Sequence, residues 1–208
     1  MALETWMLFL FAAIGLSMTP GPSGLLALTH GSMHGLRKSI FTLLGGCVGF
    51  ALVIAVSMAG MGALLMASYE AFLVAKIIGA AYLVYLGVKV FRSPPMKVDE
   101  TISSPRSGGH WKMFAEGFLV AASNPKAIIF FAAFLPQFVD ASQPQLPQFF
   151  AMALTFVTVE FIYELAVAGF AHKLKPLFAE GTFGIWFNRV TGATFVGIGG
   201  FLATMSRS

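Results

Sequence analysis

Residues 6–28 read WMLFLFAAIGLSMTPGPSGLLAL, an apolar run without a charge that contains the segment TPGPS at 19–23. About 20 apolar residues in a helix are enough to cross the roughly 30 Å hydrocarbon core of a membrane. Proline has no N–H donor and fixes φ, so two prolines within three residues must break that helix. The stretch therefore predicts a transmembrane helix that is interrupted near its middle.

The rest of the chain has the same apolar character. Of its 208 residues, 57% are hydrophobic and 11% are charged, and the mean hydropathy is +0.81. A globular protein carries about 25% charged residues, so this chain lacks the polar surface needed to face water on every side. Further apolar runs of spanning length follow at 40–68, 72–88, 113–139, 149–171 and 184–204. We expect an all-α integral membrane protein with six transmembrane helices, surrounded by membrane lipid.

The basic residues gather in alternate loops. Those on one side are Arg37, Lys38, Lys89, Arg92, Lys97, Arg106, Lys112, Lys173, Lys175 and Arg189. Lys76 and Arg207 fall on the other side. The positive-inside rule places the basic loops in the cytoplasm, which predicts that both termini lie outside. Membrane orientation accounts for the net charge of +4, and we expect no nucleic-acid partner.

A hydrophilic linker at 93–112 divides the chain into two halves, 1–92 and 113–208, with three expected spans each. KIIGAAY at 76–82 in the first half is echoed by RVTGATF at 189–195 in the second. Prolines also interrupt the first span of each half. We therefore predict two inverted three-helix repeats with broken first and fourth helices, a plan common among secondary transporters. Chance similarity between apolar segments is the alternative.

The first candidate site is the break formed by Thr19, Pro20, Gly21, Pro22 and Ser23. Unpaired backbone groups in lipid cost several kcal/mol, so the break should line protein or a water-filled cavity. A half-helix that resumes near Ser23 would present N–H groups and a positive dipole end to a carboxylate, while carbonyls at 16–18 could accept from an ammonium group. This arrangement suits a zwitterionic amino acid. The alternative is a structural kink without ligand contact.

The second candidate site is the break at Asn124, Pro125 and Lys126, which adds a cation at depth. A lysine inside a membrane span is costly unless it is paired or hydrated. Lys126 could neutralise a substrate carboxylate, pair with a carboxylate on a neighbouring helix, or extend toward a headgroup. The residues leave these three roles open.

Two glutamates, Glu160 and Glu164, stand four residues apart in the fifth span and therefore share one helix face. We expect them to face the interior of the bundle. Two carboxylates in a low-dielectric bundle repel each other and make a group able to bind and release protons. Proton coupling is one interpretation, and a pair held by Lys126 or by the polar end of the helix is the other.

His30 and His34 are also four residues apart and could in principle hold a metal ion. They have no nearby cysteine or carboxylate in the sequence, so a solvated polar face is the favoured interpretation and no metal site is predicted. Glu116, close to the start of the fourth span, is interpreted as an interfacial residue.

Gly45 and Gly49 have the spacing that lets membrane helices approach closely. We expect tight packing inside the bundle, with a homodimer seam as the alternative. The single cysteine, Cys47, excludes an internal disulfide and favours a buried structural thiol.

With these residues, the chain resembles the lysine exporter and homoserine/threonine exporter family (LysE/RhtB type). The likeness covers nearly the whole chain and rests on TPGP at 19–22, the glycine run at 35–49, GAAYL at 79–83 with Gly87, NPK at 124–126 and FLPQF at 134–138. The resemblance implies an exporter of amino acids or close derivatives in the bacterial inner membrane, driven by the proton motive force without ATPase, cofactor or prosthetic group. It does not assign Glu160 and Glu164, whose role is argued from physics alone.

Two rival functions can be weighed from the residues. A membrane enzyme would need a zinc motif or a nucleophile with a base, and the sequence offers neither. A divalent-metal exporter of similar architecture remains the alternative function, with His30, His34, Glu160 and Glu164 as its best ligands.

Overall fold

The computed structural model describes residues 2–19, 21–92, 109–140, 142–171, 185–186, 188–190, 192–193, 195–198 and 200. Every regular element in these ranges is helical. The helices are α1 (Leu3–Met18), α2 (Pro22–His34), α3 (Leu36–Ala67), α4 (Tyr69–Phe91), α5 (His110–Ala122), α6 (Pro125–Phe134) and α7 (Gln145–Gly169), with a short 3-10 helix η1 (Leu135–Gln137) after α6. The prediction of an all-α protein is confirmed.

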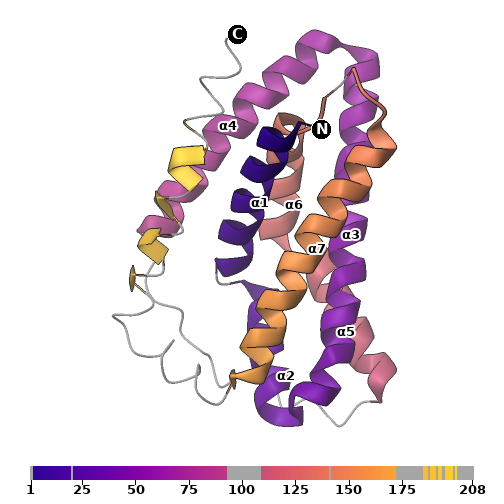
Figure 1. Ribbon diagram of the computed structural model, residues 1–208, viewed down its shortest axis with the longest axis vertical. Coiled ribbons are helices and arrows are strands. Elements are labelled where there is room, and N and C mark those ends of the chain that lie inside the picture. The colour runs from indigo at the N-terminus through magenta and orange to yellow at the C-terminus, as the bar shows by residue number, and fades with distance from the viewer. Residues whose placement is uncertain are drawn as a thin grey trace.

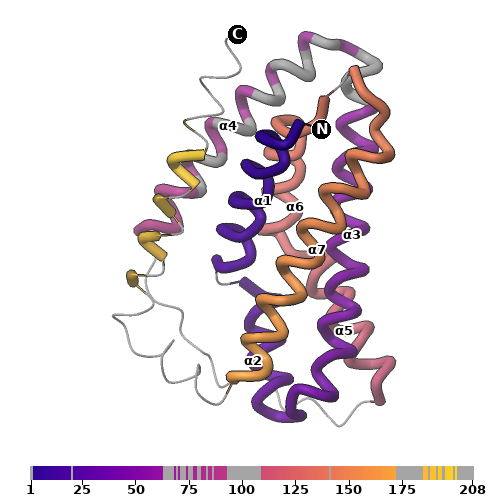
Figure 2. The backbone as a smooth tube through the Cα atoms, viewed as in Figure 1, coloured from indigo at the N-terminus to yellow at the C-terminus, as the bar shows by residue number. Residues whose placement is uncertain are grey.

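The helices run along one long axis (Figure 1). The backbone tube in Figure 2 shows α3 and α7 side by side, with α1 and α6 next to them and α4 on the outer flank. At one end of the bundle α2 ends and α3 and α5 begin, which brings Arg37, Lys38 and Lys112 to the same end. We call this the basic end. α7 runs toward it from the opposite end.

Two described helices are long and apolar enough to cross a membrane, Leu36–Gly62 within α3 and Gln145–Gly169, which is α7. Two bent pairs are also long and apolar enough when each is counted as one broken span: α1 with α2, bent by 56°, and α5 with the segment Pro125–Gln137, bent by 47°. The predicted breaks in the first and fourth spans are therefore present. The described chain accounts for up to four spans, so the count of six is not reached.

The remaining predictions about spans and domains stay untested. The third predicted span, 72–88, falls within α4. The sixth, 184–204, is only partly described. Pro20 and most of the linker at 93–112 lie outside the described residues. Within the described part, Gly87 of α4 packs against Gly192, where an added Cβ at Gly87 would lie 2.7 Å from the Gly192 carbonyl oxygen.

Glycines let α3 and α5 approach each other backbone to backbone. A Cβ at Gly45 would overlap the carbonyl oxygen of Phe114, and a Cβ at Gly117 would overlap that of Thr42. At Gly49 it would lie 2.6 Å from the Phe118 carbonyl oxygen. The predicted tight packing inside the bundle is confirmed.

Cys47, predicted to be a buried thiol, is half-buried, because it stands on α3 between the packed face and an exposed one.

An aromatic cluster fills the bundle between the helix breaks and the end opposite the basic end. Phe156 of α7 contacts Phe131 of α6 and Phe50 of α3, with ring centroids 4.8 and 5.3 Å apart. Phe9 of α1 packs on Phe138 at 5.3 Å. Such edge-to-face pairs add about 0.5–1.5 kcal/mol each beyond the area they bury. Because Phe156 precedes the first α7 glutamate by one turn, this cluster closes the bundle directly beside the candidate site.

The turn before α7 is held by its own polar groups. The buried Gln148 side chain donates to the carbonyl of Asp140 and accepts from the Asp140 N–H, at 3.0 and 2.9 Å. Hydrogen bonds from the Ser142 hydroxyl and backbone N–H keep the pKa of Asp140 below its ordinary value. A carboxylate that stays charged suits a turn at the membrane surface.

Candidate functional site

The first break ends α1 at Thr19 and starts α2 at Pro22. The Thr19 hydroxyl donates to the Gly15 carbonyl at 2.9 Å, and the Thr19 N–H donates to the Gly15 and Leu16 carbonyls. Gly21 precedes α2 in an extended conformation and provides no side-chain cap. The first N–H groups of α2 thus lack a capping side chain, which leaves the positive end of this half-helix available.

The second break ends α5 at Ser123 and starts α6 at Pro125. The Ser123 hydroxyl donates to the Leu119 carbonyl at 2.6 Å, the same four-residue step that Thr19 makes. Asn124 caps α6, since its side-chain oxygen accepts from the Lys126 N–H at 3.0 Å. Asparagine at this position is among the preferred helix caps.

The structure brings the two breaks together. The buried Asn124 side chain donates to the hydroxyl of Ser23, in the first turn of α2, at 3.4 Å. The Lys126 ammonium group donates to the carbonyls of Leu16 and Thr19 at 3.0 and 2.7 Å. A Cβ at Gly21 would lie 3.1 Å from Lys126 Nζ, so the backbone passes close to the cation. The starts of α2 and α6 and the end of α1 therefore meet at one place.

Lys126 takes a role that the sequence did not suggest. Its ammonium group binds the carbonyls at the C-terminal end of α1, where the helix dipole is negative. Among the described residues no ion pair joins it directly to a glutamate, although Glu160 and Glu164 are close enough to act on its charge. The cation is thus fixed by backbone dipoles and remains within electrostatic reach of both carboxylates.

Glu160 and Glu164 face the interior, as predicted, and each is 4% exposed. Ser17 of α1 lies beside Glu160, yet Ser17 Oγ and Glu160 Oε2 make no hydrogen bond with any described residue. Glu164 reaches α3, where its Oε2 lies 3.5 Å from the position of a Cβ on Gly46. A buried carboxylate oxygen without a partner is costly, which sets Glu160 apart from the other polar groups of this site.

Tyr163 is a member of this site that the sequence showed only as a neighbour of the glutamates. Its ring and hydroxyl lie 3.6 Å from the position of a Cβ on Gly24, in the first turn of α2. The small residue at 24 lets the tyrosine approach the start of the half-helix. Its spacing from Glu160 and Glu164 did not reveal this contact, because the partner is about 140 residues away in the chain.

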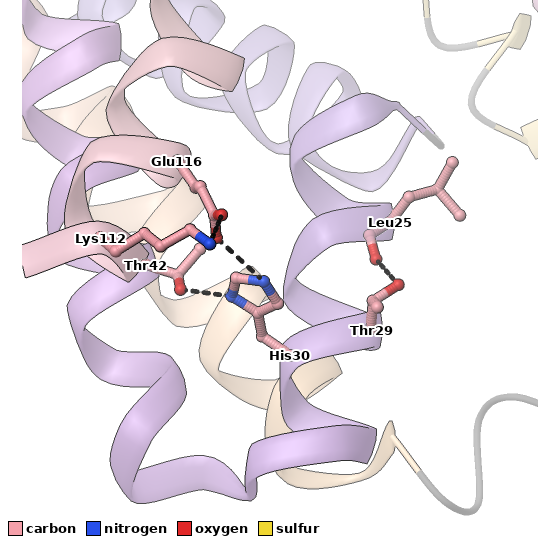
Figure 3. Close-up of polar contacts among 6 residues, drawn as sticks. All are labelled: Leu25, Thr29, His30, Thr42, Lys112 and Glu116. Carbon is pink, nitrogen blue, oxygen red and sulfur yellow. Dashed lines mark hydrogen bonds and ion pairs between the residues drawn. The ribbon is translucent and has the colours of Figure 1, made fainter. Parts of the chain in front are cut away.

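A second polar cluster lies nearer the basic end (Figure 3). His30 Nδ1 is 2.6 Å from the Thr42 hydroxyl, and His30 Nε2 is 3.5 Å from Glu116 Oε2. Glu116 also faces Lys112 at 4.0 Å. The predicted solvated polar face is therefore wrong for His30, which is 1% exposed and has a carboxylate partner. The partner was missed because it comes from α5, far away in sequence.

The suggested metal ligands do not form one centre. His30 and His34 stack edge to face, 5.5 Å apart, and no three histidine, cysteine or acidic side chains in the described chain gather closely enough to hold a metal ion. His30 uses both ring nitrogens on Thr42 and Glu116. The histidines and the α7 glutamates thus belong to two separate clusters.

Comparison with known proteins assigns the chain to a family. Residues 14–206 match the model for the LysE type translocator. An uncharacterized membrane protein of Vibrio cholerae is 31% identical, and the homoserine/homoserine lactone efflux proteins of Salmonella typhimurium and Salmonella typhi are 29% and 30% identical, each alignment covering 98% of both chains. No solved structure matches the chain. The chain therefore belongs to the family of LysE type translocators, which are membrane transporters and not enzymes.

Proposed function

We propose that this protein exports amino acids or close derivatives across the bacterial inner membrane in exchange for protons. Family membership and the names of the two Salmonella relatives support the substrate class. Homoserine and its lactone share an ammonium group, whereas only homoserine has a free carboxylate. A site for both must therefore recognise the ammonium group first.

The observation that carries the proposal is the meeting of the two helix breaks beside the α7 glutamates. Glu160 and Glu164 offer negative charge to a substrate ammonium group. The starts of α2 and α6 present N–H groups and positive dipole ends to its carboxylate or lactone carbonyl, with Asn124 and Ser23 between them. Secondary transporters commonly bind their substrates at broken helices, where half-helix N-termini face anionic groups and carbonyl ends face cations.

Charge balance at this place supports the proposed exchange. Two carboxylates and the Lys126 ammonium group leave one negative charge in a low-dielectric interior, which is unfavourable unless it is neutralised. A proton or the ammonium group of homoserine lactone can neutralise it, and binding both would leave a net positive charge. A zwitterionic amino acid adds no net charge, so with it the competition is local: its ammonium group and a proton both require a charged Glu160 or Glu164 carboxylate. Competition between proton and substrate for the same carboxylates is what an antiporter requires.

The same proposal includes an architecture. The halves 1–92 and 113–208 would be inverted repeats of three spans each, with the linker at 93–112 in the cytoplasm and both termini in the periplasm. The matching breaks support the repeat: Thr19 and Ser123 make the same hydroxyl bond, and Pro22 and Pro125 both begin half-helices. The gathering of Arg37, Lys38 and Lys112 at one end supports the orientation.

The proposal can be tested with purified protein in proteoliposomes. We expect counterflow with labelled homoserine, homoserine lactone or related amino acids, and accelerated export when a pH gradient supplies protons from the outside. Glu160→Gln and Glu164→Gln should abolish this acceleration. Glu70→Gln, at an exposed glutamate of α4, is the matched control and should behave as wild type. Indifference of the wild type to the gradient would refute antiport.

The divalent-metal exporter is examined in the same vesicles. Transport of divalent cations without transport of any amino acid would overturn the assignment. The separation of the histidines from the α7 glutamates gives this alternative no assembled ligand set in the described chain.

A further inference from the structure

We propose that His30, with Thr42 and Glu116, forms the path by which protons pass between the α7 glutamates and water at the basic end. This inference depends on the proton exchange proposed above. The proposed exchange involves only the α7 glutamates. The present inference gives His30, Thr42 and Glu116 the role of transferring protons, not of binding substrate.

The cluster joins a buried group to an accessible one. His30 is 1% exposed, while the Glu116 side chain is 33% exposed and the Lys112 side chain 51% exposed. Figure 3 shows the imidazole of His30 between the Thr42 hydroxyl and the Glu116 carboxylate, with contacts on both ring nitrogens. An imidazole held on both nitrogens can accept a proton on one and release a proton from the other.

Two helices connect this cluster to the α7 glutamates. On α3, Gly46 lies against Glu164, and Thr42 comes one turn earlier on the same face. On α7, Ala168 comes one turn after Glu164, and its backbone packs against Gly31, next to His30. One helical turn is a rise of about 5.4 Å along α3, so Thr42 is the next residue after Gly46 on this face in the direction of the basic end. The proposed path includes one water between Glu164 and the Thr42 hydroxyl.

Among the residues that the structure describes, few other groups face His30 to exchange its proton with. His34 on its own helix stacks against its ring, and Glu116 and Lys112 face it from α5. α3 contributes Thr42. Near His30 the described residues at the end of α7 and just after it are apolar, among them Val167, Ala168 and Ala171, whereas Tyr163 contacts α2 farther along, at Gly24.

The transfer conserves protons at each stage. A proton that leaves Glu164 passes through one bridging water, and the Thr42 hydroxyl, as it takes up that proton, passes its own on to His30 Nδ1. The imidazolium then releases the proton on Nε2 to the Glu116 carboxylate, which gives it up to water at the basic end. Release from Nε2 leaves the remaining proton on Nδ1. A rotation of the imidazole that exchanges the places of its two nitrogens then restores the first arrangement without further proton transfer, so one proton crosses per turnover of the path.

The experiment separates net export from exchange. Substrate–substrate counterflow without a gradient needs no net proton transfer, whereas gradient-driven export does. We expect His30→Gln and Glu116→Gln to slow gradient-driven export at least about tenfold, as for loss of a proton-transfer group, with counterflow close to wild type. His110→Gln, at an exposed histidine that starts α5 and stacks on Phe41 rather than on His30, is the control and should leave both rates unchanged.

Two results would overturn the path. An equal loss of counterflow and gradient-driven export in both variants would mean that the cluster only holds α2 to α3 and α5. Undiminished gradient-driven export would mean that protons travel elsewhere. Glu116→Gln keeps the test valid if the buried His30 variant does not fold. A wild type that ignores the gradient is a different outcome, because it removes the proposed exchange and this path with it.

Discussion

The break between α1 and α2 and the break between α5 and α6 are built alike but are stabilised by different groups. Each half-helix before a break ends on a hydroxyl residue that bonds back four residues, Thr19 in one and Ser123 in the other. Each half-helix after a break begins with proline. Only the second break has a capping side chain, Asn124.

The second break also supplies what the first lacks. Lys126 binds the carbonyls at the end of α1, and Asn124 reaches Ser23 at the start of α2. The first break contributes backbone groups and a small residue, Gly21, against which the lysine lies. The first break therefore depends on the second for the donors that bind its carbonyls.

Removing the lysine side-chain charge should have the largest effect. Lys126→Met leaves the Leu16 and Thr19 carbonyls without their donor and both glutamates without a cation. We expect the free energy of unfolding to fall by about 2–5 kcal/mol and export to be lost. Thermal unfolding in detergent and uptake by proteoliposomes measure the two effects.

Lys38→Met is the control for this change, because Lys38 is exposed at the start of α3. It should alter the midpoint of unfolding little. A Lys126→Met protein that unfolds like the control would show that the first break does not depend on the second.

Asn124 allows its two roles to be separated. Asn124→Ala removes both the cap of α6 and the contact with Ser23, and we expect a loss of about 1–2 kcal/mol in unfolding free energy. Asn124→Ser keeps a neutral oxygen that can cap α6 but has a shorter side chain that does not reach Ser23. The serine variant should recover most of the stability, and equal losses in the two variants would assign the whole effect to Ser23.

Gly21 tests how closely the lysine must lie against the first break. Its φ of −155° is accessible to alanine, but the added Cβ would lie 3.1 and 3.2 Å from Nζ and Cε of Lys126. We expect Gly21→Ala to cost about 0.5–1 kcal/mol, because the lysine must shift and alanine is a poorer helix cap than glycine. Gly60→Ala, where nothing lies within 4 Å of the new Cβ, should not destabilise the protein in the same unfolding measurement.

These comparisons explain which features the sequence could predict. The breaks follow from Pro22 and Pro125, and the inward orientation of Glu160 and Glu164 follows from the cost of charge in lipid. Both are local consequences of residue type and spacing. The six spans, the repeat and the domain boundaries stay predictions.

The partners of the polar side chains could not be predicted in the same way. The prolines predict free carbonyls near the end of the first half-helix, but not that Lys126, 107 and 110 residues away, is the group that binds them. His30 was assigned to a solvated face because its carboxylate, Glu116, belongs to α5. In both cases the contact depends on how the halves pack, which periodicity and hydropathy do not determine.

The smallest expected effect tests whether the breaks act as one unit. Ser23→Ala removes a single 3.4 Å hydrogen bond and should cost at most about 0.5 kcal/mol by itself. In a double-mutant cycle with Asn124→Ala, the two losses should add to more than the loss of the double variant, since contacting residues couple by about 0.5 kcal/mol or more. Ser23 lies in the first half of the chain and Asn124 in the second, so this coupling energy reports directly on the junction between them. If the two losses in unfolding free energy simply add, the Ser23–Asn124 hydrogen bond contributes no stability. Lys126 alone would then connect the two halves at this point.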